Sequence, residues 1–211
     1  MPLTLADAQN ILRLARFYYK GTYKSANKRY VGTTDPRTGL HDSKRAQRNT
    51  NAVRAMAQIQ QTRSQPIGGG YEGLGQHLRD NDITTGNCGE MSAVVCRICR
   101  EQLGGAPVIE VGWAGQHSHS ADHMFVMISD AGARAHMFDT IKDMHDYPMP
   151  GFWIVDCWMN IACASVDYMR LAQQKAAKWS GEQKVIWLGG SNYMQATQFV
   201  EAVLDEEIDW T

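Results

Sequence analysis

The sequence predicts an α+β fold in which helices precede an antiparallel sheet. Three observations support this prediction. Apolar residues recur at helical spacing in the first hundred residues, glycine and proline interrupt this pattern at residues 104–107, and short apolar runs follow. Helices followed by mostly sequential strands are typical of α+β proteins. With 211 residues, 44% of them hydrophobic, the chain can bury a core as one domain or as a core with an extension.

The first half is predicted to contain three helices. Thr4 and Asp7 have the spacing of a capping box before an apolar helical pattern. Pro107, just after two glycines, prevents the third helix from continuing. The glycines before that helix indicate a linker, or a mobile lid or groove wall beside a site. The helices are expected at about residues 4–21, 43–62 and 88–103, with a loop at 22–42 and the linker at 66–75.

The second half changes to short runs rich in β-branched and aromatic residues, which are typical of strands. A helix with Ser191 or Asn192 as its cap is expected near the end of the chain. The predicted strands lie at 108–113, 123–128, 135–141, 152–157 and 184–188, and the predicted helices at 166–179 and 192–206. We expect a basic helical N-terminal extension at 1–65 and a core at 66–211, together forming one compact unit.

Composition excludes some classes of protein. No apolar run approaches the roughly 18 residues of a membrane span, and the N-terminus lacks the pattern of a cleaved signal peptide. Five cysteines, an odd number at irregular spacing, do not suggest a disulfide framework. A reducing compartment is the simplest interpretation, so the protein is expected in the cytoplasm, or exported without a cleaved signal to act in a target-cell cytosol.

The net charge of −1 hides a strong asymmetry. Residues 1–63 carry 12 lysines and arginines but three acidic residues, while the remainder of the chain is acidic. Such polarity predicts either an acidic partner for the basic segment or packing of that segment on its own acidic core. Nucleic acid is a minor alternative, because basic and aromatic residues are not interleaved as in single-strand binding proteins.

Cys88 is the leading candidate for a catalytic residue. It stands at the start of the third predicted helix, where the helix dipole and a nearby imidazolium would favour a thiolate. His123 opens one predicted strand and Asp156 closes another. A thiol, an imidazole and a carboxylate are the parts of a cysteine acyl-transfer site, with the Cys88 backbone N–H as an oxyanion donor.

Three stretches resemble the transglutaminase-like core of the papain-like cysteine enzymes: Gly86-Asn87-Cys88-Gly89-Glu90, Asp122-His123-Met124-Phe125-Val126 and Trp153-Ile154-Val155-Asp156. The resemblance covers about residues 84–160. It implies a papain-like fold with Cys88 as nucleophile, His123 as acid and base, and Asp156 as the orienting carboxylate. This superfamily includes transglutaminases, proteases and protein-glutamine deamidases, among them bacterial effectors and toxins. We therefore expect deamidation or transglutamination of a protein substrate, which could be a host protein, without a cofactor or metal.

The chain departs from the family pattern at several points. Cys157 follows Asp156 where the family often has proline, and the papain signature Cys-Gly-Ser-Cys-Trp is absent, which makes a papain-like protease the second choice. No glutamine directly precedes Cys88 to complete an oxyanion hole. Gln76 and Asn87 are the candidate amides, with Gln76 preferred, and Trp158 is expected to wall the acyl pocket.

Other constellations support weaker hypotheses. His117, His119 and His123 approach a metallo-β-lactamase box, with one residue too many between His119 and Asp122, so a metallohydrolase is a lesser alternative. Without the metal, His117 and His119 belong to a polar loop that could touch substrate. Cys96 and Cys99 have Cys-x-x-Cys spacing but lie inside a predicted helix, where core packing is the simpler interpretation. A non-catalytic binding module that uses the basic segment is a further alternative.

Overall fold

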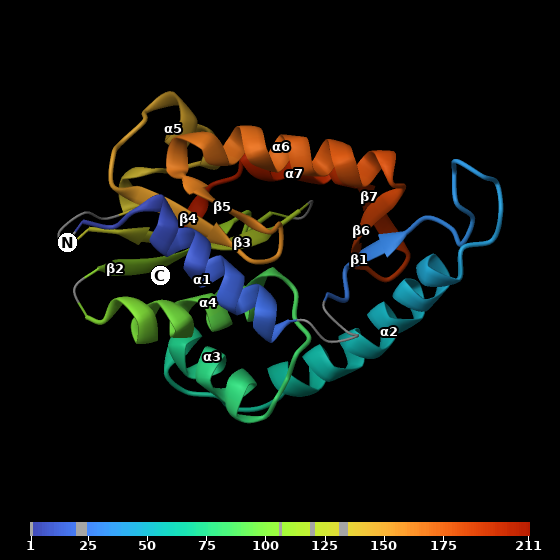
Figure 1. The fold of residues 1–211 in the computed structure, drawn as a ribbon, viewed down its shortest axis with the longest axis horizontal. Coiled ribbons are helices and arrows are strands. Elements are labelled where there is room, and N and C mark those ends of the chain that lie inside the picture. The colour runs from blue at the N-terminus through green and yellow to red at the C-terminus, as the bar shows by residue number, and fades with distance from the viewer. Residues whose placement is uncertain (1, 20–24, 106, 119–120, 131–134) are drawn as a thin grey trace.

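The computed structural model describes residues 2–19, 25–105, 107–118, 121–130 and 135–211, and its α+β architecture confirms the predicted class (Figure 1). The two sheets of the described residues are antiparallel, one of five strands in the order β5-β4-β3-β2-β8 and one of three strands in the order β1-β6-β7. The helices are α1 (Leu5–Tyr18), α2 (Ser43–Arg63), α3 (Gly70–Asp80), α4 (Cys88–Leu103), α5 (Ile141–Asp146), α6 (Ser165–Gly181) and α7 (Ala196–Leu204), with a 3-10 turn at Ala135–Met137. The strands are β1 (Lys28–Tyr30), β2 (Val108–Ala114), β3 (His123–Ser129), β4 (Phe152–Asp156), β5 (Ile161–Ala164), β6 (Lys184–Gly189), β7 (Asn192–Gln195) and β8 (Ile208–Trp210).

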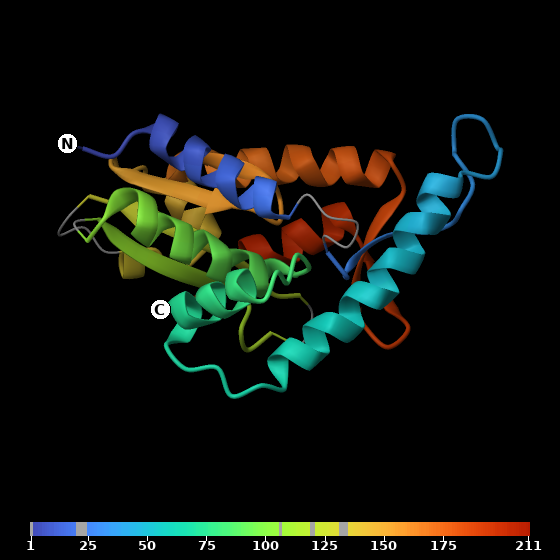
Figure 2. The ribbon, with the colours of Figure 1, turned by 60° about the horizontal axis from the view of Figure 1, so that its bottom comes forward.

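Helices cover both faces of the five-stranded sheet, with α1 and α4 on one face and α6 on the other (Figure 2). The alternation of side chains along β3 follows this arrangement. Met124 lies toward Gly89 of α4, whereas the Phe125 ring packs 5.2 Å from that of Tyr168 on α6. Every residue of β3 is buried as a result, and a polar side chain on this strand needs a partner inside the protein.

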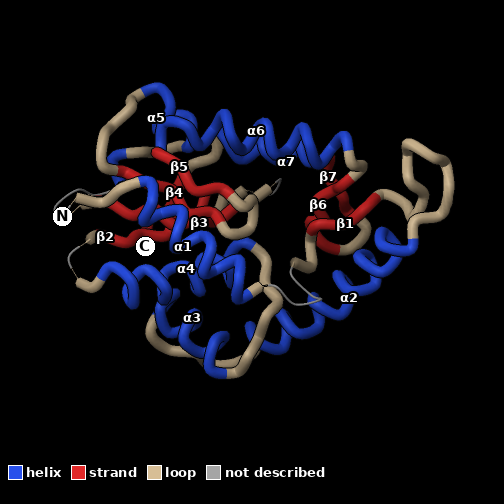
Figure 3. Tube along the Cα trace, in the orientation of Figure 1, coloured by secondary structure: helices blue, strands red, loops and turns tan. Residues whose placement is uncertain are grey.

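The basic N-terminal segment contributes directly to this architecture. Ala8, Ile11 and Ala15 of α1 belong to the same apolar core as α4 and the large sheet. Further along, β1 pairs with β6, so the small sheet joins the N-terminal segment to residues near the C-terminus (Figure 3). The Arg45 guanidinium of α2 donates hydrogen bonds to the carbonyl of Glu182 and to the side chain of Gln183. Residues 1–65 therefore help to build the core that they were expected to extend.

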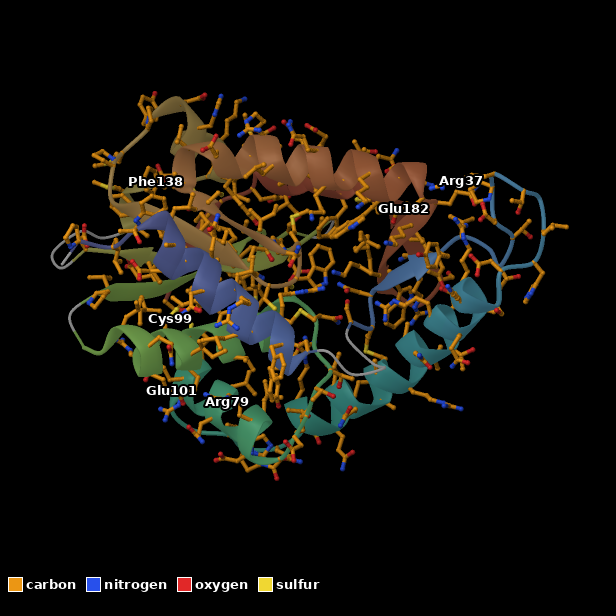
Figure 4. The ribbon with its side chains drawn as sticks, viewed as in Figure 1. Arg37, Arg79, Cys99, Glu101, Phe138 and Glu182 are labelled. Atoms are coloured by element: carbon orange, nitrogen blue, oxygen red, sulfur yellow. The ribbon has the colours of Figure 1, made fainter. Side chains whose placement is uncertain are left out.

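The linker predicted at 66–75 is wrong over most of its length, because α3 begins at Gly70. Leu74 and Leu78 give this helix an apolar side that packs on the core, and Gly75 allows close contact with α4. A Cβ at Gly75 would lie 2.1 Å from the backbone oxygen of Ala93. The glycine that suggested a chain break is thus required for helix packing. Side-chain ion pairs, such as that between Arg79 and Glu101, hold α3 on α4 (Figure 4).

Three further predictions of secondary structure are wrong in part. The strand expected at 135–141 is a 3-10 turn followed by α5, whose first turn is capped by Thr140 and Asp143. The helix expected at 192–206 begins only at Ala196, because the residues before it pair with β6 as β7. The loop expected at 22–42 contains β1, and β5 and β8 had no predicted counterparts. β1 and β8 are three residues long and pair with strands distant in the sequence, whereas β5, with four residues, pairs with the neighbouring strand β4.

None of the described helices combines the length and the apolar character required to cross a membrane.

We predict that Gly75→Ala destabilises the protein by about 1–3 kcal/mol, because the added methyl group collides with the α4 backbone. Gly181→Ala is the matched control, since it also adds a methyl group to a helical glycine but meets no atom within 4 Å. Urea unfolding measures both changes. Equal stability of the two variants would contradict the close α3–α4 contact.

Candidate active site

Cys88 is the first residue of α4, and a buried acidic side chain fixes this helix start. Asn87 precedes the helix, and its backbone N–H donates to the Glu90 carboxylate over 2.9 Å. Arg63, at the end of α2, donates two hydrogen bonds of 2.6 and 3.2 Å to the same carboxylate. Glu90 is 3% exposed, so its charge requires this bidentate partner. The pair therefore ties the N-terminal segment to the backbone that carries the thiol.

His123 and Asp156 meet at one edge of the large sheet. They lie at the start of β3 and the end of β4, which come together because the two strands are antiparallel neighbours. The His123 Nε2 and Asp156 Oδ2 atoms are 2.8 Å apart, and both side chains are buried. The Tyr168 hydroxyl of α6 donates to Asp156 Oδ2 over 2.7 Å, and the Met159 backbone N–H donates to Oδ1 over 2.8 Å. The carboxylate thus receives a donor on each oxygen.

These contacts favour a charged His123–Asp156 pair. Burial disfavours the imidazolium, but the charge and hydrogen bond of Asp156, with a contribution from Cys88, raise the pKa of His123 to about 10. Burial likewise disfavours the Asp156 carboxylate, but His123, Met159 and Tyr168 lower its pKa below the usual value. The charged ring therefore contributes stability fully below its ordinary pKa near 6.5, and this contribution is lost as pH rises toward about 10.

The second ring nitrogen of His123, Nδ1, does not contact Asp156. Nδ1 is buried and has no hydrogen-bond partner among the described residues. The Cys88 thiol is near enough to contribute to the raised pKa of the ring. With Nε2 occupied by Asp156, Nδ1 is the nitrogen available to exchange a proton with Cys88 or with a group bound beside it. The arrangement is suited to proton transfer at the sulfur.

Cys88 lines a cavity of about 300 Å³, which we call the thiol cavity. Besides the start of α4, its walls are formed by the segment before β1, the α2 helix, the loop before β3, the β6 strand and α7. Arg63 brings a positive charge to one wall, and Phe199 lies 6.3 Å from the His123 ring. The other residues lining the cavity are Asn27, Met56, Asn87, Ser118, Ala121, Asp122, Trp187, Leu188 and Gly189.

The side-chain oxygens of Asn87 and Asn27, near Cys88, accept hydrogen bonds from within the protein. The Asn87 Oδ1 accepts from the backbone N–H groups of Ala26 and Asn27, over 3.0 and 3.2 Å. The Asn27 Oδ1 accepts from Trp158 Nε1 over 3.0 Å and from the Ser25 hydroxyl over 2.8 Å. Among the described residues no hydrogen bond uses either Nδ2, and both residues line the thiol cavity. Each amide can therefore donate to a ligand near the thiol.

The structure separates the three residues proposed around the nucleophile. Asn87 lies beside Cys88, as its position in the sequence requires. Gln76 does not line the thiol cavity, because its amide group on α3 donates to Asp80. The preference for Gln76 over Asn87 is therefore not supported. Trp158 is fully buried and packs its ring 5.1 Å from His123, so it backs the imidazole and does not wall the thiol cavity.

His117 and the Cys96–Cys99 pair, which suggested other kinds of site, do not line the thiol cavity. His117 lies on the surface, 3.8 Å from Asp209, and His119 falls outside the described residues. Over the described part of the chain, no three His, Cys, Asp or Glu side chains are grouped to hold a metal ion. Cys96 and Cys99 are buried in α4, and burial raises the pKa of both thiols.

Comparisons with known proteins identify no relative of this chain: no protein-family model, no curated protein and no solved structure matches it. The geometry of the site therefore carries the functional argument.

We predict that iodoacetamide labels Cys88 at least about tenfold faster than any other cysteine, because Cys88 opens onto a cavity beside a charged imidazole. The other four thiols are buried, and burial raises the pKa of each. Peptide mapping by mass spectrometry after short exposure to the reagent measures the five rates. Cys163, 5% exposed and outside the thiol cavity, is the internal control. Equal rates at Cys88 and Cys163 would contradict a reactive site.

Proposed function

We propose that the protein is a cysteine-dependent acyl-transfer enzyme that acts on side-chain amides of other proteins, with glutamine deamidation as its reaction. The observation that carries this proposal is the buried, charged His123–Asp156 pair at the sheet edge. The second nitrogen of the His123 ring has no hydrogen-bond partner among the described residues, and the Cys88 thiol at the start of α4 is near enough to raise the pKa of the ring. The proposal includes a papain-like, transglutaminase-like arrangement of helix and sheet, as the sequence resemblance implies.

The first half of the reaction forms a thioester. The Cys88 sulfur attacks the carbon of a glutamine carboxamide, and the carbonyl oxygen becomes an oxyanion. The Cys88 backbone N–H belongs to the first turn of α4 and makes no hydrogen bond among the described residues, so it can donate to this oxygen. His123 gives its proton to the departing nitrogen, the carbon–nitrogen bond breaks, and ammonia leaves.

The second half consumes water. His123 is neutral after it has given its proton to the leaving group, and it then removes a proton from a water molecule that attacks the thioester. The carbon–sulfur bond breaks, the sulfur leaves as thiolate, and glutamate is released. A primary amine in place of water would give transglutamination through the same intermediate. Tyr168 and Met159 keep Asp156 in place through both halves, which holds the imidazole in one orientation.

The shape of the thiol cavity favours a side chain as substrate. Its volume of about 300 Å³ is at the lower end of the range of roughly 300–1,000 Å³ found for ligand pockets. Residues 187–189 of β6 and residues 121–122 before β3 line the cavity beside the thiol, and a cavity of this volume suits entry of one side chain better than binding of an extended peptide. Peptide-bond cleavage is the runner-up reaction. All five cysteines are free and buried, which supports action in a reducing compartment such as a target-cell cytosol.

We predict that Asn27→Ala lowers kcat by about 100-fold if the Asn27 amide donates to the oxyanion, with a smaller effect on KM. The Asn27 Oδ1 is bonded to Trp158 and Ser25 and the residue lines the thiol cavity, so its Nδ2 is the group available to donate there. Asn81→Ala is the matched control, because this exposed asparagine at the C-terminal end of α3 bonds to His77 and lies outside the thiol cavity. Equal activity of the two variants would exclude Asn27 as an oxyanion donor.

Incubation with a native proteome tests the reaction itself. We expect the wild-type protein to convert specific glutamines to glutamates, with a gain of about one mass unit per site, and Cys88→Ala to convert none. The variant removes the sulfur from a residue that is 9% exposed, so its fold should persist, which a thermal melt verifies. New peptide termini that depend on Cys88 would indicate proteolysis. Identical proteomes after treatment with the two forms would contradict acyl transfer.

A further inference from the structure

A second cavity is lined by Trp158, which packs on His123 but does not line the thiol cavity, and we call it the basic cavity. Its volume is about 410 Å³. Five lysines and arginines line it, from α1, β1, α2, α6 and β6, and the described residues that line it include no aspartate or glutamate. The basic residues are Arg16, Lys28, Arg48, Lys175 and Lys184, and the others are Ser25, Tyr30, Met91, Trp158, Met159, Asn160 and Trp179.

Most of these positive charges lack a carboxylate partner. Arg16 and Arg48 donate to the backbone oxygens of Cys157 and Ser25, over 3.4 and 2.7 Å. Among the described residues, Lys175 makes neither a hydrogen bond nor an ion pair. Lys184 pairs with Glu182, which lies at the end of α6 (Figure 4). Arg16, Arg48 and Lys175 therefore bring charge without a carboxylate partner to one partly buried space, and Lys28 adds a buried amine to it.

Lys28 contacts both tryptophans of the basic cavity. Its Nζ donates to the backbone oxygen of Trp158 and lies 4.4 Å from the centre of the Trp158 ring and 4.7 Å from that of Trp179. Burial, followed by the charges of Arg48 and Arg16, lowers the pKa of Lys28 well below its usual value. Burial and neighbouring lysines and arginines also lower the pKa of Lys175. An anion in the cavity would relieve this repulsion.

We propose that the basic cavity binds a small soluble anion that carries several phosphate charges. Phosphate oxygens suit this lining because they accept hydrogen bonds from lysine and arginine together, and arginine can offer two parallel donors to one phosphate. Several charges are needed to match the basic groups that lack a carboxylate partner, and the volume limits the ligand to a compact molecule. Three of the basic residues of the N-terminal segment, Arg16, Lys28 and Arg48, would then bind this anion.

Binding would have a structural consequence. The basic groups come from α1, β1 and α2 on one side and from α6 and β6 on the other. A bound anion would therefore link the N-terminal segment to the second half of the chain and stabilise the folded state over the unfolded state. Trp158 belongs to this cavity and also packs on His123, so its fluorescence reports on a site next to the imidazole.

Inorganic tripolyphosphate is the probe for this site. We expect it to raise the melting temperature of the wild-type protein in a saturable manner, to change tryptophan fluorescence, and to bind more weakly as sodium chloride is added. Lys175→Gln should weaken its affinity about tenfold, which corresponds to the loss of one charge-assisted contact. The fold should tolerate this variant, because Lys175 makes no hydrogen bond to the described residues, and melting without ligand verifies it.

Lys142→Gln is the matched control. It removes the same charge from α5, at a residue that pairs with Asp205 and lies outside the basic cavity. Its affinity for tripolyphosphate should stay within about twofold of the wild type. Equal weakening in both variants would show that the anion responds to overall charge, and it would overturn the proposal. Failure of tripolyphosphate at about 1 mM to shift either melting or fluorescence would overturn it as well.

Discussion

The buried pair of His123 and Asp156 is the interaction on which the site depends. A charged imidazole and a carboxylate 2.8 Å apart at the edge of a covered sheet are costly unless their remaining polar atoms have partners. Helix α6 supplies the Tyr168 hydroxyl, and the turn after β4 supplies the Met159 N–H. Both oxygens of the Asp156 carboxylate therefore have hydrogen-bond donors. The Nδ1 atom of His123 has no partner among the described residues, and it is the ring nitrogen available to Cys88. The Asp156 carboxylate therefore links β3, the turn after β4 and α6, and it also holds the imidazole that transfers the proton.

The N-terminal segment supports the same centre from the other side. Arg63 forms an ion pair with Glu90 and so fixes the start of α4. The Asn87 side-chain oxygen accepts hydrogen bonds from the backbone N–H groups of residues 26–27. Asn27 in turn bonds to Trp158, whose ring packs on His123. The N-terminal segment therefore places an amide and a positive charge at the thiol. It also lines the basic cavity, which shares Trp158 with the site.

The sequence predicted the α+β class and the principal helices and strands because their apolar periodicity is strong and local. It also predicted Cys88, His123 and Asp156 as a group, since a helix start and two neighbouring strand ends could meet if the helix packed on the sheet. Asn27, Arg63 and Tyr168 were missed, because their roles arise from contacts across 60, 27 and 12 residues of chain and no local pattern signals them. The helix at Gly70–Asp80 was missed because glycine favours a break locally, whereas close contact between helices required it.

The titration of the His123 ring, followed by NMR of the imidazole, tests the central claim most directly. Burial alone would lower the pKa of this ring, so a raised value requires the opposing charge of Asp156 and the contribution of Cys88. We expect the ring to stay protonated well above pH 7 in the wild type, and Asp156→Asn to lower its pKa. Cys88→Ala should lower the pKa by a smaller amount. A ring that titrates below its ordinary value near 6.5 in the wild type, unchanged by Asp156→Asn, would contradict the account.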